Sequence, residues 1–122
     1  MSSETIRRVV NDKQLASLGD AFVNFIYSLA LTEIGGRPRA TKVSDRILSD
    51  AFRLAGLREY LGTRLSRKDL ANAAESLLVE AYRKDLISIN ESVSVLTRDP
   101  ENLQESLSNL LKIAAERVAK ER

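Results

Sequence analysis

Two acidic side chains stand at positions where helices could bring them together. Asp20 lies near the start of a long, largely apolar run, Leu15 to Ile34. Glu75 lies in a helical pattern over residues 67–84, with Asn72 one turn before it. On each helix the acid falls on a stripe apart from the main apolar face. If the two helices pack side by side at the usual distance of about 8–10 Å, these three side chains can converge on one point.

Such a cluster would suit a hard cation. Carboxylate and amide oxygens are the ligands that Mg²⁺ prefers, and this ion usually takes only one or two carboxylates. An ion held there could activate water and bind a scissile phosphate. The alternative, which the spacing alone favours, is that both acids are exposed surface groups or cap neighbouring chain ends.

The composition removes several kinds of chemistry. The 122 residues include no cysteine and no histidine, which excludes thiol catalysis, histidine metal ligands and imidazole bases. Catalysis must therefore use carboxylates, lysines, hydroxyls or a bound metal. The apolar run from Ala21 to Leu31 is interrupted by Asn24 and Ser28, so it is too short for a membrane span, and the N-terminus lacks the features of a signal peptide. We expect a cytoplasmic protein with no membrane partner.

The distribution of charge is more informative than the net charge of +2. Between Glu33 and Asp69 nine lysines and arginines stand against five acids. A local excess of this kind could neutralise backbone phosphates of a nucleic acid. The alternative is a solvated helix surface in a charge-rich protein.

The helix over Leu15–Ile34 is predicted to bury one apolar stripe in the core. That stripe consists of Leu15, Leu18, Phe22, Phe25, Ile26 and Leu29. Asn11 with Gln14 resembles a capping box before the helix, and Gly35-Gly36 ends it, because glycine adopts positive φ without cost. Gly19 costs about 1 kcal/mol relative to alanine within a helix, so it needs a packing or functional reason. One such reason is a second helix, or a ligand, lying against the backbone beside the acid.

Start and stop signals predict the other helices. The predicted segments are a short helix or arm within residues 1–10, a helix from a Ser44 cap to about residue 55, a short piece at 58–61, helices over 67–84 and 88–98, and a last helix opened by Asp99-Pro100. Gly56 followed by Leu57 is typical of a Schellman stop. We find no strand pattern and no internal repeat. The chain is therefore predicted to be one all-α domain over residues 1–122, of about six or seven helices, with the C-terminal ones within 88–122.

Two of these segments also resemble a known family. Leu15–Ala21, LASLGDA, is similar to the ribonuclease III signature, whose core is a Leu-Gly-Asp-Ala run on a helix. Leu70–Ser76, LANAAES, and onward to Tyr82, resembles the second signature of that family, and Ala55–Leu61 is similar to the usual approach to it. The resemblance covers about residues 11–84. Two motifs in the right order at compatible spacing make it fairly specific.

The resemblance implies an all-α endonuclease domain that forms a two-fold dimer. It implies binding of double-stranded RNA in a cleft between subunits and hydrolysis with Mg²⁺, for which Mn²⁺ can substitute. Asp20 and Glu75 would be the catalytic metal ligands, with Asn72 as a neutral ligand or a water-orienting group. Such RNA is read mainly by shape and phosphates. Candidate phosphate contacts are Arg37, Arg39, Lys42, Arg67 and Lys68.

The chain departs from the family at two acidic positions. Ala16 stands where the family commonly has a glutamate, and Asn72 where it has an aspartate. The small Mini-III branch also tolerates a non-acidic residue at both positions. We also expect no appended double-stranded-RNA-binding domain in this chain. The chain therefore resembles a Mini-III-like or archaeal ribonuclease III-like branch. Two functions stay open: a Mg²⁺-dependent endoribonuclease of RNA processing, and a catalytically weak or inactive homodimer that binds structured RNA. A helical module unrelated to RNA would require an accidental motif match.

A separate argument for a homodimer comes from the second half of the long helix. Its apolar residues surround much of the circumference, and a helix that is apolar all round is buried on all sides. These residues are Phe25, Ile26, Leu29, Leu31 and Ile34. A two-fold partner would bury them. The alternative is that this helix is simply the centre of the domain core.

Overall fold

The computed structural model describes residues 3–121, which form helices joined by short loops and contain no strand. The elements are α1 Ser3–Val10, α2 Lys13–Gly35, α3 Asp45–Leu54, the 3₁₀ turn η1 Arg58–Tyr60, α4 Arg67–Arg83, α5 Ile89–Leu96 and α6 Leu103–Lys120. The all-α prediction is confirmed. The part of the first predicted segment that falls on residues 1 and 2 lies outside the described residues.

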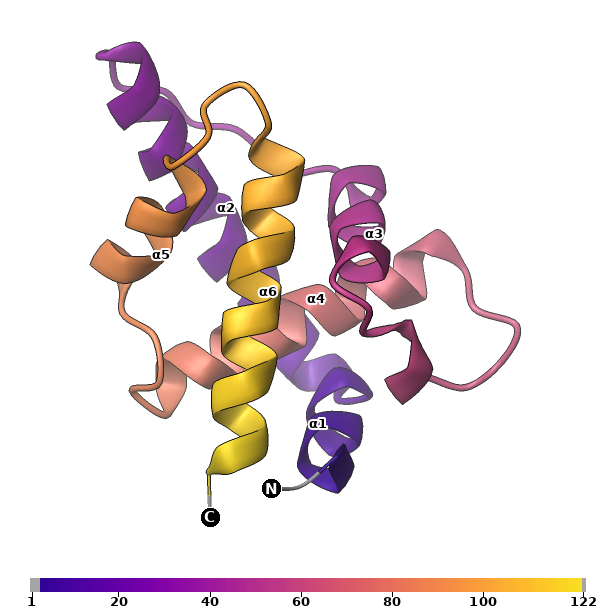
Figure 1. Cartoon of the computed structure of the whole chain (residues 1–122). Coiled ribbons are helices and arrows are strands. Elements are labelled where there is room, and N and C mark those ends of the chain that lie inside the picture. The colour runs from indigo at the N-terminus through magenta and orange to yellow at the C-terminus, as the bar shows by residue number, and fades with distance from the viewer. Residues whose placement is uncertain (1–2, 122) are drawn as a thin grey trace.

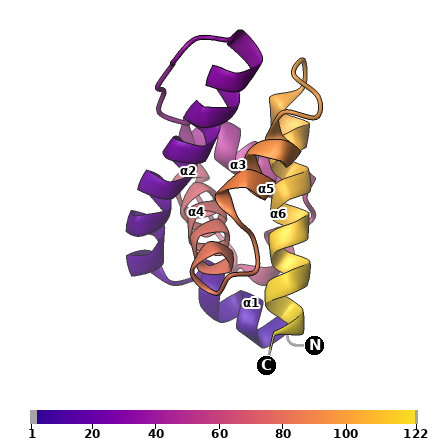
Figure 2. The same cartoon turned by 90° about the vertical axis from the view of Figure 1, so that its left-hand side faces the viewer.

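Helix α4 lies in the middle of the molecule. Figure 2 shows it between α2 on one side and α6 on the other, and Figure 1 shows α6 crossing in front of it. Helices α1 and α3 also pack against α4. Its predicted core residues are all completely buried, namely Leu70, Ala73, Ala74, Leu77, Leu78 and Ala81. A helix in contact with neighbours on several sides fixes where each of its side chains points, and this includes Glu75.

The face of α2 that packs against α4 differs from the predicted stripe. Leu18 and Phe25 are 51% and 52% exposed. The buried residues of α2 are Ala16, Gly19, Phe22, Val23, Ile26, Tyr27 and Ala30. Small residues decide this orientation, because they let two helix backbones approach each other. A Cβ added at Gly19 would lie 2.5 Å from the carbonyl carbon of Glu75, and the carbonyl oxygen is nearer still. Gly19 therefore has the packing reason that its place in a helix requires.

Local signals set most helix ends. Gly36 and Gly56 both adopt positive φ, 72° and 75°, after α2 and α3. Ser44 caps α3 through a hydrogen bond from the Ile47 N–H to its hydroxyl oxygen. Ser66 forms a reciprocal capping box with Asp69 at the start of α4. The ends at Gly36, Ser44 and Gly56 agree with the sequence predictions, and α4 begins at residue 67 as predicted.

Two predicted starts are wrong. The N-cap of α2 is Asp12, whose carboxylate accepts hydrogen bonds from the backbone N–H groups of Gln14 and Leu15. Asn11 instead donates its side-chain amide to the Arg7 carbonyl oxygen at 2.7 Å. Likewise α6 begins at Leu103 with Asn102 as its cap, and Asp99-Pro100 belongs to a preceding turn. In both cases a nearby residue caps the helix instead, because its side-chain oxygen accepts hydrogen bonds from backbone N–H groups of the first turn.

By length and composition α2 could cross a membrane, since it has 23 residues and a mean hydropathy of 1.3 over its best window. The length of its uninterrupted apolar run is therefore not enough to exclude a span, contrary to the sequence argument. Its close packing against α4 and its row of hydrogen-bonded polar side chains, described below, are features of a core helix in a globular domain.

Candidate active site

Asp20 of α2 and Glu75 of α4 meet where these two helices are in closest contact. Their carboxyl groups interact, and each shifts the pKa of the other. Both line a surface cleft of about 500 Å³, and Asn72 lines the same cleft one turn earlier on α4. Glu75 is only 5% exposed, whereas the Asp20 side chain is 43% exposed. The structure thus brings together the three residues that the sequence suggested as metal ligands.

The two carboxyl groups have opposite electrostatic character. Burial, together with the hydrogen bond and negative charge of Asp20, raises the pKa of Glu75 from 4.5 to about 8. The hydrogen bond from Glu75 and the contact with Lys42 hold the pKa of Asp20 below its usual value. Near neutral pH, without a bound cation, Glu75 is therefore protonated and donates to an ionised Asp20. At neutral pH the pair therefore carries one proton and one negative charge.

A row of polar side chains on α2 places a lysine beside this pair. Asn24, Ser28 and Thr32 follow one another at four-residue spacing and hydrogen-bond the backbone of the segment 39–43; we call them the polar ladder. The Arg39 N–H donates to Thr32 at 2.9 Å, the Thr41 N–H to Ser28 at 2.9 Å and the Val43 N–H to Asn24 at 2.8 Å. The segment therefore runs back along α2 in a fixed register.

This register brings Lys42 to Asp20. The Lys42 ammonium lies 3.2 and 3.3 Å from the two Asp20 carboxylate oxygens, and Asn24 donates to one of them at 3.3 Å. The sequence suggested Lys42 as a phosphate contact but not as a partner of the acid. The signal was available in part, because Asp20 and the ladder share one stripe of α2 at spacings of four.

Three further charged residues line the cleft: Lys13, Asp45 and Lys68. Lys68 was a predicted phosphate contact and lies 3.9 Å from the Asp45 carboxylate. Asp45 and Lys13 were not singled out from the sequence. Asp45 contributes to the raised pKa of Glu75 by its negative charge. Asp45 is the first residue of α3, where an acidic side chain is common because it interacts favourably with the helix dipole. Its place in the cleft could therefore not be predicted from the sequence.

The other predicted phosphate contacts lie outside the cleft. Arg37 and Arg39 are exposed on the loop between α2 and α3, and Arg67 is exposed at the first position of α4. Only Lys42 and Lys68 of the predicted basic set therefore border the acid pair. The remaining arginines can reach only more distant parts of an extended ligand.

The donor set fits a single hard cation. Two carboxyl groups and one amide offer oxygen ligands on one side of a solvent-accessible cleft, which matches the few protein ligands that Mg²⁺ uses. Within residues 3–121 no group of three or more acidic, histidine or cysteine side chains is close enough to hold a metal ion.

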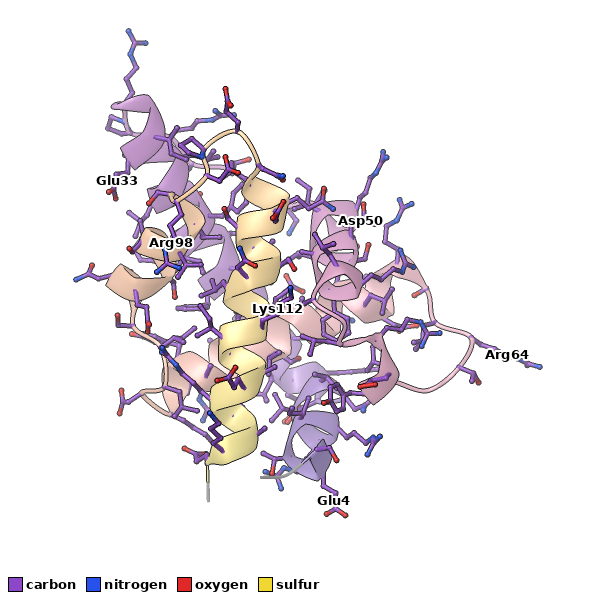
Figure 3. The ribbon with its side chains drawn as sticks, in the orientation of Figure 1. Glu4, Glu33, Asp50, Arg64, Arg98 and Lys112 are labelled. Atoms are coloured by element: carbon purple, nitrogen blue, oxygen red, sulfur yellow. The ribbon has the colours of Figure 1, made fainter. Side chains whose placement is uncertain are left out.

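The raised pKa of Glu75 predicts how stability depends on pH. Between its unfolded value of 4.5 and its folded value of about 8, the folded protein binds more protons than the unfolded chain, so the free energy of unfolding falls as pH rises. Without divalent cations we expect the melting temperature to be lower at pH 8.5 than at pH 5, by roughly 5 °C. Thermal denaturation of the wild type and of Glu75→Gln measures this, since the variant should lose most of the difference. Glu33→Gln, at an exposed carboxylate on α2 that projects outward in Figure 3, should keep it.

The fold and the cleft define a class of helical domain with a two-carboxylate site between its two most closely packed helices. A family model described as ribonuclease III matches residues 13–120, which include both acids and extend to the end of α6. The chain belongs to the ribonuclease III family. This membership indicates an RNA-cleaving class of protein. No curated protein matches the chain significantly.

Proposed function

We propose that the protein is a Mg²⁺-dependent endoribonuclease that cleaves double-stranded or structured RNA during RNA processing in the cytoplasm. The observation that carries this proposal is that Asp20 and Glu75, from two different helices, line one open cleft together with Asn72. The family match supports RNA as the substrate. The neutral residues Ala16 and Asn72 support a place near the Mini-III-like branch of the family.

Asp20, Glu75 and Asn72 would hold the ion, which when bound supplies positive charge at the scissile phosphate and acidifies a water molecule. The Glu75 carboxyl would have to be ionised to act as a ligand, so binding of a cation would release its proton to solvent. Asn72 contributes an amide that can orient a water without adding charge. The closely packed α2 and α4 hold the two acids in place, so little reorganisation is needed.

The basic residues supply the contacts to phosphate. Lys13, Lys42 and Lys68 border the cleft and can meet phosphates next to the cleaved bond. Arg37, Arg39 and Arg67 lie further away and would follow the backbone of a longer duplex. Contacts of this kind neutralise phosphates without reading bases, so the protein should show little sequence specificity.

A second candidate function is a catalytically weak or inactive homodimer that binds structured RNA. The specific observation that favours it is the loss of negative charge at Ala16 and Asn72, both of which line the cleft. Incubating the wild type with long duplex RNA and Mg²⁺ distinguishes the two. We expect fragments that form from duplex RNA, not from the separated strands, and that disappear with a chelator. A duplex that is bound but stays intact across Mg²⁺ and Mn²⁺ titrations would instead identify the binding protein.

We also propose that the protein acts as a homodimer. Support comes from an apolar surface formed by Leu18, Phe22 and Phe25 of α2 with Tyr82 of α4, which we call the α2 face. The Phe22 and Tyr82 rings stack with centroids 4.8 Å apart, and Leu18, Phe25 and Tyr82 are 39–52% exposed. A contiguous exposed apolar patch of this type marks an interaction site, and a two-fold dimer would bury it against its own copy.

Replacing Phe25 with glutamate tests the α2 face. A buried aromatic residue at the centre of an interface typically contributes 2 kcal/mol or more, so we expect Phe25→Glu to weaken dimerisation by roughly 30-fold or more. Sedimentation velocity over a range of protein concentrations measures this. Leu54→Glu is the matched control, because Leu54 is 55% exposed on α3, away from this surface, and should leave the dimer intact. A wild type that sediments as a monomer at all concentrations would contradict the homodimer.

A further inference from the structure

The backbone around Lys42 is anchored to α2, and this places its exposed side chain at Asp20. Its ammonium contacts both oxygens of Asp20, at 3.2 and 3.3 Å. The backbone on either side of it is bonded to α2, through Thr41 to Ser28 and through Val43 to Asn24. An exposed ion pair alone contributes little, with a median of about 0–1 kcal/mol, so the ion pair does not account for this anchoring. The polar ladder places a positive charge at the acids before any ligand arrives.

The cleft contains as many lysines as carboxyl groups, so it carries no excess of negative charge. Three carboxyl-bearing residues and three lysines line it, namely Asp20, Asp45, Glu75, Lys13, Lys42 and Lys68. Two divalent cations in such a site would add four positive charges with no matching acids, and the two positions that could have supplied them, 16 and 72, are neutral. A second divalent cation would be repelled by the three lysines without gaining a carboxylate at either position, so this set of charges favours a single ion.

We propose that Lys42 takes the place of a second divalent cation, so that each chain binds a single ion and the Lys42 ammonium contacts a non-bridging oxygen of the scissile phosphate. This proposal rests on the proposed function, because it assumes that RNA enters the cleft. Lys42 is then a catalytic residue that provides positive charge where negative charge develops. Asn24, Ser28 and Thr32 are positioning residues that act through the segment 39–43.

Lys42 has two positions in this scheme. In the free protein it neutralises Asp20, as the structure shows. When a cation binds Asp20, the ammonium is displaced from the carboxylate and is free to meet the phosphate at the same place. A lysine side chain has the length and the rotatable bonds for this exchange, and it needs no change in the anchored backbone.

The first test measures Mn²⁺ binding to the protein alone, by electron paramagnetic resonance and calorimetry, so that it does not depend on RNA cleavage. We expect one ion per wild-type chain. Lys42→Met should bind that ion about tenfold more tightly, because a competing charge is gone. Lys42→Glu should admit a second ion. The matched control is Lys112→Met, at an exposed lysine of α6 on the other side of α4 from α2, and it should bind Mn²⁺ as the wild type does (Figures 2 and 3).

The second test measures cleavage of duplex RNA. Lys42→Met should lower kcat by about 100-fold while KM changes much less, since one preorganised donor to the reacting phosphate is lost. Lys42→Arg should recover part of the rate. Ser28→Ala keeps the lysine itself but removes the hydrogen bonds between Ser28 and Thr41, which loosens the backbone next to Lys42, so it should show a smaller fall in kcat of the same type. A lysine with a merely structural role would not separate kcat from KM in this way.

The outcomes separate this inference from the proposed function. A wild type that binds two ions, or a Lys42→Met variant that binds Mn²⁺ no more tightly than the wild type, would overturn the inference even if RNA is cleaved. Absence of RNA cleavage together with one bound ion and the tighter Mn²⁺ binding of Lys42→Met would defeat the proposed function and support single-ion binding limited by Lys42. Absence of Mn²⁺ binding in the wild type and every variant would reject both.

Discussion

Asp20→Asn is expected to abolish Mg²⁺-dependent cleavage of duplex RNA, with a fall in rate of more than about 100-fold. Even residues that only support a metal ligand commonly cost 10- to 100-fold in affinity or activity when they are changed, and here one of two carboxylates is removed. Asparagine keeps the shape of the side chain but supplies no charge to hold the ion. Single-turnover cleavage of a labelled duplex at saturating protein measures the effect.

The variant should remain folded, which makes the loss of activity interpretable. The Asp20 side chain is 43% exposed and its ion pair with Lys42 is exposed, so its removal should cost no more than about 1 kcal/mol. Thermal denaturation checks this. Asp50→Asn is the matched control, because Asp50 is a carboxylate on α3 with 40% of its side chain exposed, pairs with Arg53 and does not line the cleft. If Asp20→Asn cleaves as fast as Asp50→Asn, Asp20 does not hold the catalytic ion.

The helix ends were largely predictable because they depend on neighbouring residues. Gly36, Gly56 and Ser66 act within one turn of the helices that they end or begin, so their effect can be read from the sequence. The orientation of α2 was not predictable in the same way. Leu18 and Phe25 form a convincing apolar stripe, and nothing local shows that α4 packs instead where Gly19 removes the side chain. For a helix that is apolar on most sides, periodicity does not select the buried face.

The candidate site was predictable to the extent that it lies on helices. The proximity of Asp20 and Glu75 could be predicted because each lies on a definite face of its helix and because the family motifs contain both residues. The contacts of Lys42 could not be predicted, because its position depends on the path of the loop after α2. That path follows from side chains 10 or more residues earlier, at Ser28 and Asn24, which fix the returning segment. Asp45 was missed for a related reason, since it enters the cleft only through the way in which α3 packs.

Gly19→Ala is expected to lower the stability of the protein by about 3 kcal/mol, the upper part of the usual range for overpacking, and its melting temperature by roughly 10 °C. The added methyl group would lie 2.5 Å from the Glu75 carbonyl carbon, a main-chain atom of a helix buried on several sides. A side chain could rotate away, but a helix backbone must move as a whole. Helices α2 and α4 would therefore separate locally at the point where the two acids meet, so Mn²⁺ binding should weaken even at temperatures where the variant is folded.

Gly35→Ala gives the matched control, since it makes the same chemical change at the other end of the same helix, where nothing lies within 4 Å of the added atom. There alanine removes flexibility from the unfolded chain without a clash, so stability should stay the same or rise by up to about 1 kcal/mol. Circular dichroism melts of both variants, with calorimetric Mn²⁺ titrations below the melting range, compare them directly. Equal stability and equal Mn²⁺ affinity in the two variants would show that α2 and α4 are not in close contact at Gly19, and the geometric basis for pairing Asp20 with Glu75 would be lost with it.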